Sequence, residues 1–257
     1  MAMNPRLLVP RATFNPRSIS NLGLWLDASA DSSLTFNATT VSEWRDLSGN
    51  GRHMEQGTAV AQPIATTRTQ NGRRVLDFQG AQFMLGNSAS LNALRDKPGG
   101  TGFIVCKLDG AALQQALFFA AISGSNALAR YLMDNNPASS SWRVGGRRLD
   151  SDSFGSVTLN ASVDTNSNVL TGVLDCANSD AFLYENGSLL GSNTSFQTDG
   201  NTSDTDSGAV SIGAAAGGTA FLDGFIGEVI LYQRALSDAE RQRVERYLGV
   251  KWGITVE

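Results

Sequence analysis

The chain has 257 residues, of which 41% are hydrophobic and 17% charged, and its formal net charge is −4. An acidic balance of this kind argues against a general nucleic-acid binder, which presents a basic surface. No stretch approaches the roughly 20 apolar residues of a membrane-spanning helix, and the first residues lack the apolar run of a secretion signal. We therefore expect a globular protein made in a cytoplasm, with no nucleic-acid partner and no membrane insertion.

The first 20 residues differ from the rest of the chain. They hold three arginines and no acid, so they carry +3 and leave −7 for the remainder. Half of the six prolines also lie here, and each proline fixes its own φ and biases the preceding residue away from helix. We expect residues 1–20 to form an extended arm that docks on another protein, with Arg6, Arg11, Phe14 and Arg17 as its anchor.

From residue 21 onward, short apolar runs alternate with turns rich in Gly, Asn and Ser. This spacing is typical of an antiparallel β-sandwich. The dipeptide Asn186-Gly187 supplies the two positive-φ residues of a type I′ turn and predicts a hairpin. The segment 191–208 has almost no apolar side chain, so we expect an exposed loop. The predicted strands are 22–28, 41–46, 74–80, 82–86, 101–108, 116–123, 131–134, 142–146, 168–176, 181–185, 188–192, 209–215 and 224–233.

A helix is predicted near the end of the same domain, which we place at residues 21–257. Ser237 and Glu240 have the spacing of a capping box, in which each side chain bonds the backbone amide of the other residue. Apolar residues then recur at helical spacing. The helix should cover about 237–249, with Gly249 as its stop or, alternatively, Gly253.

Two further features concern local structure. A second, shorter helix is predicted over 88–96.

Cys106 and Cys176 each share a strand face with leucines or isoleucines, so we expect small buried hydrophobes with free thiols. A disulfide between them is the alternative, which a reducing cytoplasm disfavours.

The order of these elements resembles the laminin G-like/concanavalin A-like jelly-roll superfamily. "LGLWLDASA", "VSEWRDLSGNGRHM" and "NGRRVLDFQGAQFML" resemble its opening, "AFLYENGSLLGS" its late hairpin, and "FLDGFIGEVILYQRALSDAERQRVERYLGVKWGI" its ending. The resemblance covers residues 22 to about 252. It implies an all-β, antiparallel jelly-roll β-sandwich with an extended N-terminal arm and one short C-terminal helix. The arm ahead of "NPRSISNLGLWLDAS" resembles the versions found in bacteriophage structural proteins.

Glu228 is a carboxylate inside the last predicted strand. Strand alternation places it on one face with Ile226, Ile230 and Tyr232. A retaining glycosidase needs two carboxyl groups about 5–5.5 Å apart, and laminarinase-like members of the superfamily place such acids along one strand face. Positions 226 and 230 carry no acid here. We expect a structural carboxylate that bonds backbone or an arginine such as Arg234, and no enzymatic activity.

The segment "DLSGNG" places the oxygen-bearing residues Asp46, Ser48 and Asn50 at alternate positions. This resembles the first half of a calcium loop. The acid that would close a twelve-residue loop is missing, because position 57 is Gly57. The alternative is an Asx-type turn in which Asp46 bonds backbone amides. We expect no cofactor, with calcium left open.

The segment around Trp142 and Arg143 is the best candidate for recognition. The indole can stack on a sugar ring while the arginine bonds its hydroxyls, and Asp134 and Asn135 just before it are typical hydroxyl partners. The alternative is that Trp142 belongs to the core and that the arginines nearby pair with acids of the sandwich. The sequence does not separate the two.

The arm and the sandwich together predict a non-enzymatic structural protein of a virion, as a capsid decoration, head fibre or tail component. The arm would bind capsid or tail subunits, and the sandwich would project and contact host glycans. We expect a homo-oligomer that is made in the host cytoplasm and located in the virion. The alternatives are a carbohydrate-binding module and a laminarinase-like glycan hydrolase.

Overall fold

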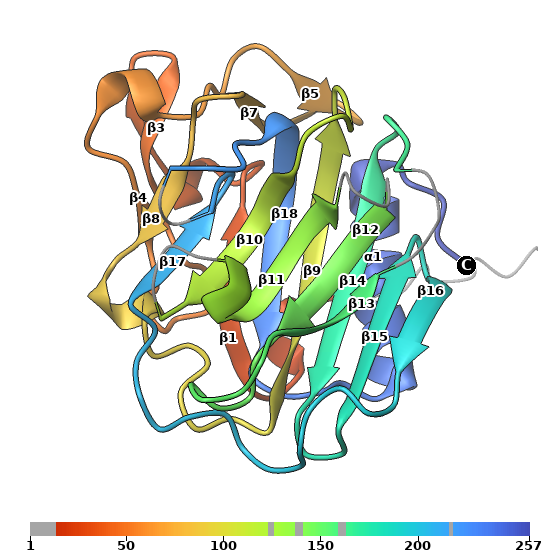
Figure 1. Cartoon of the computed structure of the whole chain (residues 1–257). Coiled ribbons are helices and arrows are strands. Elements are labelled where there is room, and N and C mark those ends of the chain that lie inside the picture. The colour runs from red at the N-terminus through yellow and green to blue at the C-terminus, as the bar shows by residue number, and fades with distance from the viewer. Residues whose placement is uncertain (1–13, 123–125, 137–140, 159–162, 216–217) are drawn as a thin grey trace, which may run out of the picture.

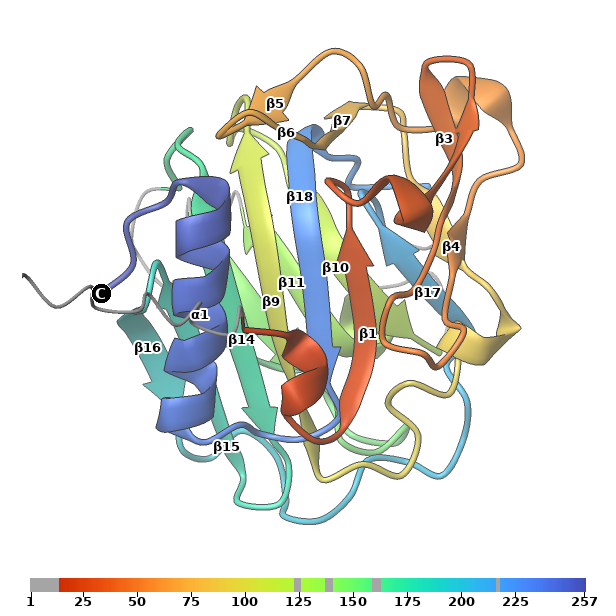
Figure 2. The ribbon, with the colours of Figure 1, turned by 180° about the vertical axis from the view of Figure 1, so that it is seen from behind.

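A computed structural model describes residues 14–122, 126–136, 141–158, 163–215 and 218–257. Two antiparallel β-sheets pack face to face, and a single α-helix covers the outer face of one of them (Figures 1 and 2). The predicted all-β sandwich with one C-terminal helix is confirmed. Each of the thirteen predicted strands is present in it.

The first sheet has seven strands and carries the helix. Strand β18 is second from one edge and pairs with β1, β9 and β7. The order is β1 (Leu22–Asp27), β18 (Asp223–Tyr232), β9 (Gly99–Leu108), β14 (Asn168–Asp175), β15 (Asp180–Glu185) and β16 (Ser188–Asn193), with β7 (Leu76–Gln79) joined to β18.

The second sheet has nine strands, and a separate two-stranded ribbon, β5 (Thr69–Gln70) with β6 (Arg73–Arg74), lies beside the sandwich. The order of the nine is β13 (Gly155–Thr158), β12 (Ser141–Gly146), β11 (Ala129–Asn136), β10 (Gln115–Ala121), β17 (Ala209–Ile212), β8 (Met84–Gly86), β4 (Met54–Glu55), β3 (Thr40–Trp44) and β2 (Leu34–Asn37). The short 3₁₀ helices are η1 (Pro16–Ser18), η2 (Asp31–Ser33), η3 (Ala59–Ala61), η4 (Ser88–Ser90) and η5 (Asn126–Leu128).

The main core fills the space between the sheets. Trp44, Phe78 and Ile104 are among its fully buried side chains. Cys106 and Cys176 belong to the same core and are free thiols, as expected. Burial raises the pKa of the Cys176 thiol to about 12, so the thiol stays protonated and unreactive at neutral pH.

Helix α1 spans Asp238–Trp252 and begins with the predicted capping box between Ser237 and Glu240. It ends one turn later than Gly249, because Gly253 takes the left-handed conformation that closes a helix (φ 68°). The helix predicted over 88–96 is wrong. Only the 3₁₀ turn η4 forms there, and the Asn87 side chain accepts from the backbone of Ser90 at 3.2 Å, which satisfies the amide locally.

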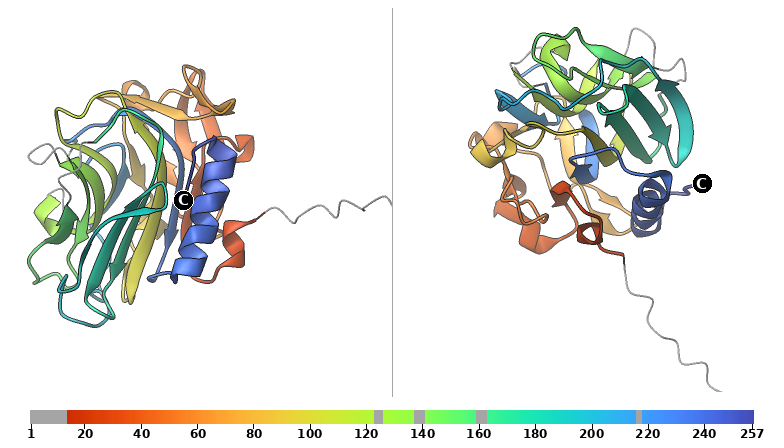
Figure 3. Two further views of the ribbon diagram at one scale, coloured as in Figure 1. Left: turned by 90° about the vertical axis from the view of Figure 1, so that its right-hand side faces the viewer. Right: turned by 90° about the horizontal axis from the view of Figure 1, so that it is seen from below.

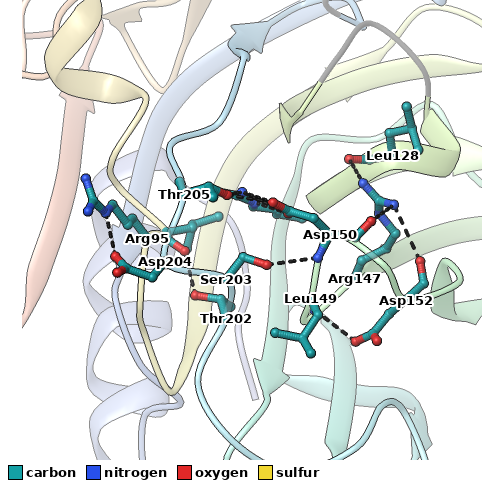
Figure 4. A network of polar contacts seen from close by, with 12 residues as sticks. Arg95, Leu128, Arg147, Leu149, Asp150, Asp152, Thr202, Ser203, Asp204 and Thr205 are labelled. Carbon is teal, nitrogen blue, oxygen red and sulfur yellow. Dashed lines mark hydrogen bonds and ion pairs between the residues drawn. The ribbon is translucent and has the colours of Figure 1, made fainter.

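The hairpin at Asn186 and Gly187 is confirmed, with φ of 52° and 87°. The prediction that 191–208 is an exposed loop is wrong in part, because Thr202 and Ser203 are buried. Figure 4 shows the reason: hydroxyl groups of this loop bond the neighbouring loop, as where Ser203 Oγ accepts from the amide of Asp150 at 2.8 Å. A polar segment can therefore be buried when its hydroxyl groups find partners.

A β-bulge at Gly227 interrupts the alternation along β18. Ile226 faces the core between the sheets, whereas Glu228, Ile230 and Tyr232 face α1. The prediction that all four share one face is therefore wrong for Ile226, because a bulge adds one residue and reverses the alternation. Gly227 allows this close packing, since a Cβ there would lie 2.9 Å from the Trp252 ring.

The arm expected over residues 1–20 is described from Phe14 onward, and residues 14–20 pack on the sandwich. Ile19 is 3% exposed and belongs to the cluster under α1. The Tyr232 hydroxyl donates to the carbonyl of Pro16 at 2.9 Å. Figure 3 (left) shows η1 and α1 on the same outer face. Residues 14–20 therefore belong to the folded unit, because their apolar groups are buried by it.

Candidate functional site

Glu228 is fully buried between β18 and α1, and four donors surround its carboxylate. Oε1 accepts from Trp25 Nε1 at 2.8 Å and from the Tyr247 hydroxyl at 2.9 Å. Oε2 accepts from Lys251 Nζ at 2.7 Å and Trp252 Nε1 at 2.8 Å. The partners named in the sequence prediction are wrong, since Arg234 pairs with Glu240 instead.

A second carboxylate, Asp27, lies beside Glu228 on the paired strand β1, which the sequence did not indicate. Lys251 Nζ lies 2.5 Å from Asp27 and 2.7 Å from Glu228, so one ammonium bridges both acids. Burial, and then the charge of Asp27, raise the pKa of Glu228, while Lys251 lowers it. Every oxygen of Glu228 is occupied by a donor of α1 or β1, so this cluster joins the helix to the sheet.

Asp46, Ser48 and Asn50 form a turn stabilised by hydrogen bonds, which was the alternative to a calcium loop. Asp46 Oδ1 accepts from the amides of Trp25 and Ser48 at 3.0 and 2.8 Å, and Oδ2 accepts from the Ser48 hydroxyl at 2.7 Å. Asn50 donates its amide to the carbonyl of Leu22 at 2.8 Å. These N–H and O–H donors point at the carboxylate oxygens of Asp46, which are the oxygens that a cation would need as ligands. Within the described residues, no group of three His, Cys, Asp or Glu side chains is arranged to hold a metal ion.

Trp142 lies in the core at 3% exposure and donates to Glu185 at 2.8 Å. Its ring faces are therefore covered by protein, which is the alternative that the sequence left open. Arg143 lies on the other face of β12 and forms an ion pair with buried Asp134, at 2.8 Å from Nε and 2.5 Å from Nη2. The four predicted sugar-contacting residues thus do not form one exposed surface, because Trp142 points inward and Arg143 outward.

Asp134 and Asn135 nevertheless support a pocket at the rim of the sandwich. Burial raises the pKa of Asp134, and hydrogen bonds and charge from Arg143, followed by the hydrogen bond from Gln114, act against this rise. Gln114 donates to Asp134 at 2.5 Å. Asn135 donates to the carbonyl of Leu113 at 2.9 Å. Both residues therefore position the loop 110–114 rather than contact a ligand themselves.

This rim pocket has a volume of about 580 Å³, and its lining includes the first residues of β10 and β18. Figure 1 shows that these two strands begin at the same end of the sandwich. One wall is the loop 110–114 and the other is the segment 219–223. It is lined by Gly80, Gly110, Ala112, Leu113, Gln114, Gln115, Thr219, Ala220, Phe221 and Asp223.

Backbone contacts fix the second wall. The amide of Ala116 donates to the carbonyl of Ala220 at 2.9 Å. Ala220 itself has φ of 51°, a conformation that is uncommon for a residue other than glycine. The amide of Asp223 donates to Gln115 Oε1 at 2.7 Å. The ring of Phe221 packs on Phe83, with centroids 6.0 Å apart. The pocket is therefore held in shape without a ligand.

The chemistry of the rim pocket suits a polar ring with an apolar face. Phe221 is partly exposed and supplies an aromatic surface, while Thr219, Gln114 and Asp223 supply a hydroxyl, an amide and a carboxylate. Sequence reasoning missed these residues, because they lie in two loops more than 100 positions apart. The only local signal was the single aromatic residue in the turn-forming run "GGTAFLDG".

The expected assembly anchor divides into two parts. Arg6 and Arg11 lie outside the described residues. Phe14 packs on Tyr247 with ring centroids 5.4 Å apart, and Arg17 donates to the carbonyl of Leu47 at 2.8 Å. Phe14 and Arg17 thus contact their own sandwich. None of the helices that the structure describes is long and apolar enough to span a bilayer.

Solved structures with similar folds share little sequence with this chain. One of them is the carbohydrate-binding module CBM40 of the Ruminococcus gnavus IT-sialidase, bound to α2,3-sialyllactose. It is 19% identical with a TM-score of 0.50, and the match covers 61% of this chain and 86% of the module. The receptor-binding domain of botulinum neurotoxin D is 11% identical (TM-score 0.62; 90% of this chain, 53% of its own). The Trypanosoma rangeli sialidase is 15% identical with a TM-score of 0.58, and the match covers 92% of this chain and 34% of the sialidase.

These likenesses concern the fold, and the chain spans about half of the toxin domain and a third of the T. rangeli sialidase. A comparison with curated protein sequences gives no match. A family model described as the concanavalin A-like lectin/glucanases superfamily matches residues 104–240, more than half of the chain. The chain therefore belongs to the concanavalin A-like lectin/glucanase superfamily.

Proposed function

We propose that this chain is a non-enzymatic, glycan-binding structural protein of a virion, and that the rim pocket is where it holds a sugar. The observation that carries the glycan-binding part is the pocket itself, which sets the ring of Phe221 beside Gln114, Thr219 and Asp223. Carbohydrates bind by stacking an apolar ring face on an aromatic side chain while polar groups bond the hydroxyls.

Two of the similar structures support this choice of ligand class. The R. gnavus module binds sialyllactose, and the toxin domain is a receptor-binding domain. Both are the binding parts of larger proteins. We extend to this chain only the class of ligand, a glycan on a cell surface, and leave its identity to the experiment below.

A hydrolase is the less favoured function, because Glu228, the acid considered for catalysis, cannot reach a substrate. Glu228 is fully buried and both of its oxygens accept from side chains of α1 and β1. Asp134, a deeply buried acid next to the rim pocket, is paired with Arg143. General acid–base catalysis requires a carboxyl group within hydrogen-bond reach of the scissile bond.

The virion setting is supported by the first residues of the chain. Arg6 and Arg11 stand among prolines and apolar residues without a single acid, whereas the remainder of the chain carries −7 as a whole. An extended cationic segment suits docking on acidic capsid or tail subunits. We propose that it anchors the sandwich, as a homo-oligomer, on a particle that is assembled in the host cytoplasm.

A glycan array with the wild type and Phe221→Ala tests the glycan proposal. We expect binding to one group of glycans and a loss of roughly tenfold in affinity for the variant, which corresponds to about 1.4 kcal/mol. Phe36→Ala is the matched control, because Phe36 is an aromatic side chain 42% exposed elsewhere on the sandwich. Equal binding by all three proteins would move the sugar away from the rim pocket.

Incubation of the array-positive glycans with the protein tests the absence of catalysis. Chromatography should show intact glycan after prolonged incubation. Cleavage that Asp223→Asn abolishes would instead make the rim pocket an active site. Mass spectrometry of purified particles tests the virion role, and absence of the chain from every particle fraction would refute it.

A further inference from the structure

A second concave surface lies on the opposite side of the molecule from the nine-stranded sheet. Figure 2 shows α1 on the outer face of the seven-stranded sheet, beside β14 and β15. The surface is a groove of about 300 Å³ lined by β15 and the first turn of α1. Its floor contains Val173, Phe182 and Tyr184. We call it the helix groove. The glycan-binding proposal makes no use of it.

Strand register explains why this floor is apolar with acids at one end. Val173 of β14 pairs directly with Phe182 of β15, and the next pair on the same face is Asp175 with Asp180. Phe182 and Tyr184 pack at 6.5 Å between centroids. Phe182 remains partly exposed, so the floor offers aromatic surface next to two carboxylates.

The helix side of the groove adds a third acid. Asp238 stands at the start of α1, beside Arg241, whose guanidinium lies 3.8 Å above the Tyr184 ring. Arg241 is 2.6 Å from buried Glu245 and 3.1 Å from Asp238. Its charge is therefore shared with Glu245, and the groove as a whole is negative. Acids beside an apolar floor suit a cationic segment that also carries apolar residues.

We propose that the helix groove binds residues 1–13 of a second copy of this chain. Arg6 and Arg11 flank the apolar run Leu7, Leu8 and Val9, and the segment has no acid. The positive charges of the segment complement the acids of the groove, and its apolar run complements the floor. Thirteen extended residues reach at most roughly 45 Å, so the segment is long enough to leave its own sandwich and contact a neighbour.

Charge favours binding of residues 1–13 in the groove of a second copy over binding in the groove of their own chain. The described chain begins at Phe14, which packs on Arg243 and Tyr247. Arg241 instead faces Tyr184 of β15, and Glu245 accepts from Thr171 of β14. Residues 1–13 join the sandwich at Phe14. To reach the groove of their own chain, they must cross the outward side of α1. That side carries the exposed arginines Arg243 and Arg246, which repel Arg6 and Arg11. A neighbouring copy approaches the groove without crossing them.

A contact of this kind is head to tail, because each copy offers one segment and one groove. Such contacts build rings when the rotation closes and filaments when it does not. The proposal rests on the homo-oligomer of the proposed function and makes no use of the rim pocket. In an open head-to-tail assembly, the copy at one end keeps its segment free to dock on the particle. The ligand class at the groove is thus a short basic segment rather than a glycan.

Sedimentation velocity of the full chain over a range of concentrations tests the contact. The wild type should self-associate, and added salt should weaken it, since exposed ion pairs are screened. A groove variant, Asp175→Asn with Asp180→Asn, and a segment variant, Arg6→Ala with Arg11→Ala, should each need at least tenfold more protein to associate. An equimolar mixture of the two variants should form a heterodimer, because one copy retains the segment and the other the groove.

The control variant is Asp31→Asn with Asp206→Asn, which removes two exposed carboxylates away from the groove and should associate like the wild type. Melting curves of all variants should coincide, which separates loss of contact from loss of fold. A wild type that stays monomeric at every concentration, or a mixture that fails to pair, would overturn the proposal. Glycan-array binding should be unchanged in the groove variant, so failure of this contact and failure of glycan binding are distinguishable.

Discussion

The indole nitrogen of Trp252 donates a 2.8 Å hydrogen bond to Glu228, which stands 24 positions earlier in the chain. The last turn of α1 is thereby joined to strand β18 of the seven-stranded sheet. Lys251, the neighbour of Trp252, adds an ion pair to the same carboxylate at 2.7 Å. A fully satisfied buried carboxylate of this kind fixes one orientation of the helix on the sheet.

Glu228→Gln should therefore destabilise the fold rather than remove an activity. The amide nitrogen of glutamine would face Lys251 and Trp252, both of which are donors. Lys251 would lose one of its two acidic partners and keep Asp27. Removing one member of a buried pair costs about 3–5 kcal/mol. Urea unfolding of the variant should show a loss in this range.

Glu55→Gln serves as the control, because Glu55 is exposed on β4, and it should unfold like the wild type. Incubation with β-glucans should give no turnover with either protein. A Glu228→Gln variant of unchanged stability would mean that α1 is held by its apolar face alone.

How far the sequence could predict this cluster depends on the type of contact. The structural role of Glu228 and the buried face of α1 follow from local patterns, because they rest on strand alternation and helical spacing. The partners Trp25 and Asp27 lie about 200 positions away, and no local pattern encodes such a distance. The bulge at Gly227 is hidden as well, since a glycine in a strand is compatible with regular pairing.

The capping box of α1 should make stability depend on acidic pH. Arg234, followed by the bonds with Ser237, lowers the pKa of Glu240 to about 2 from an ordinary value of 4.5. The folded state thus binds this proton less readily than the unfolded state. The contribution of Glu240 is complete above about pH 4.5 and should be lost as the pH falls towards 2.

Urea midpoints measured between pH 6 and pH 2 should show this loss in the wild type. Glu240→Gln should be less stable at pH 6 and should show a shallower decline over the same interval. Parallel curves for the two proteins would mean that another carboxyl group governs the acid limb.

Gly227→Ala should destabilise the protein through the bulge. The added methyl group would lie 2.9 Å from the Trp252 ring, so the ring or the strand must shift. Overpacking of this kind costs typically about 1–3 kcal/mol, and tryptophan fluorescence should change with it. Gly57→Ala is the control, because a Cβ at that position meets nothing within 4 Å. Equal midpoints for the two variants would show that the site tolerates the methyl group.

The candidate site was less accessible to sequence reasoning than the fold. The strands, the hairpin and the helix are encoded by residues close together in the chain. The rim pocket joins a loop that follows β9 to a segment that precedes β18, and its shape depends on the buried residues Asp134 and Asn135. From the sequence, those two residues are predicted to contact a sugar beside Trp142, whereas in the structure they bond the loop 110–114 that forms one wall of the pocket.

Two deletions should separate the N-terminal segment from the folded unit. Removal of residues 2–13 should leave the melting temperature unchanged, because the described packing begins at Phe14. Removal of residues 2–20 should lower stability by about 3 kcal/mol or more, since Ile19 is lost from the core, worth about 1.5–3 kcal/mol, and the buried Tyr232 hydroxyl loses its acceptor. Both deletions should abolish co-sedimentation with the assembly.

Ile19→Ala in the full chain is the matched control, because it should weaken the fold while preserving attachment. If the shorter deletion still co-sediments with full occupancy, residues 1–13 are not the anchor, and the sandwich itself must provide the interface.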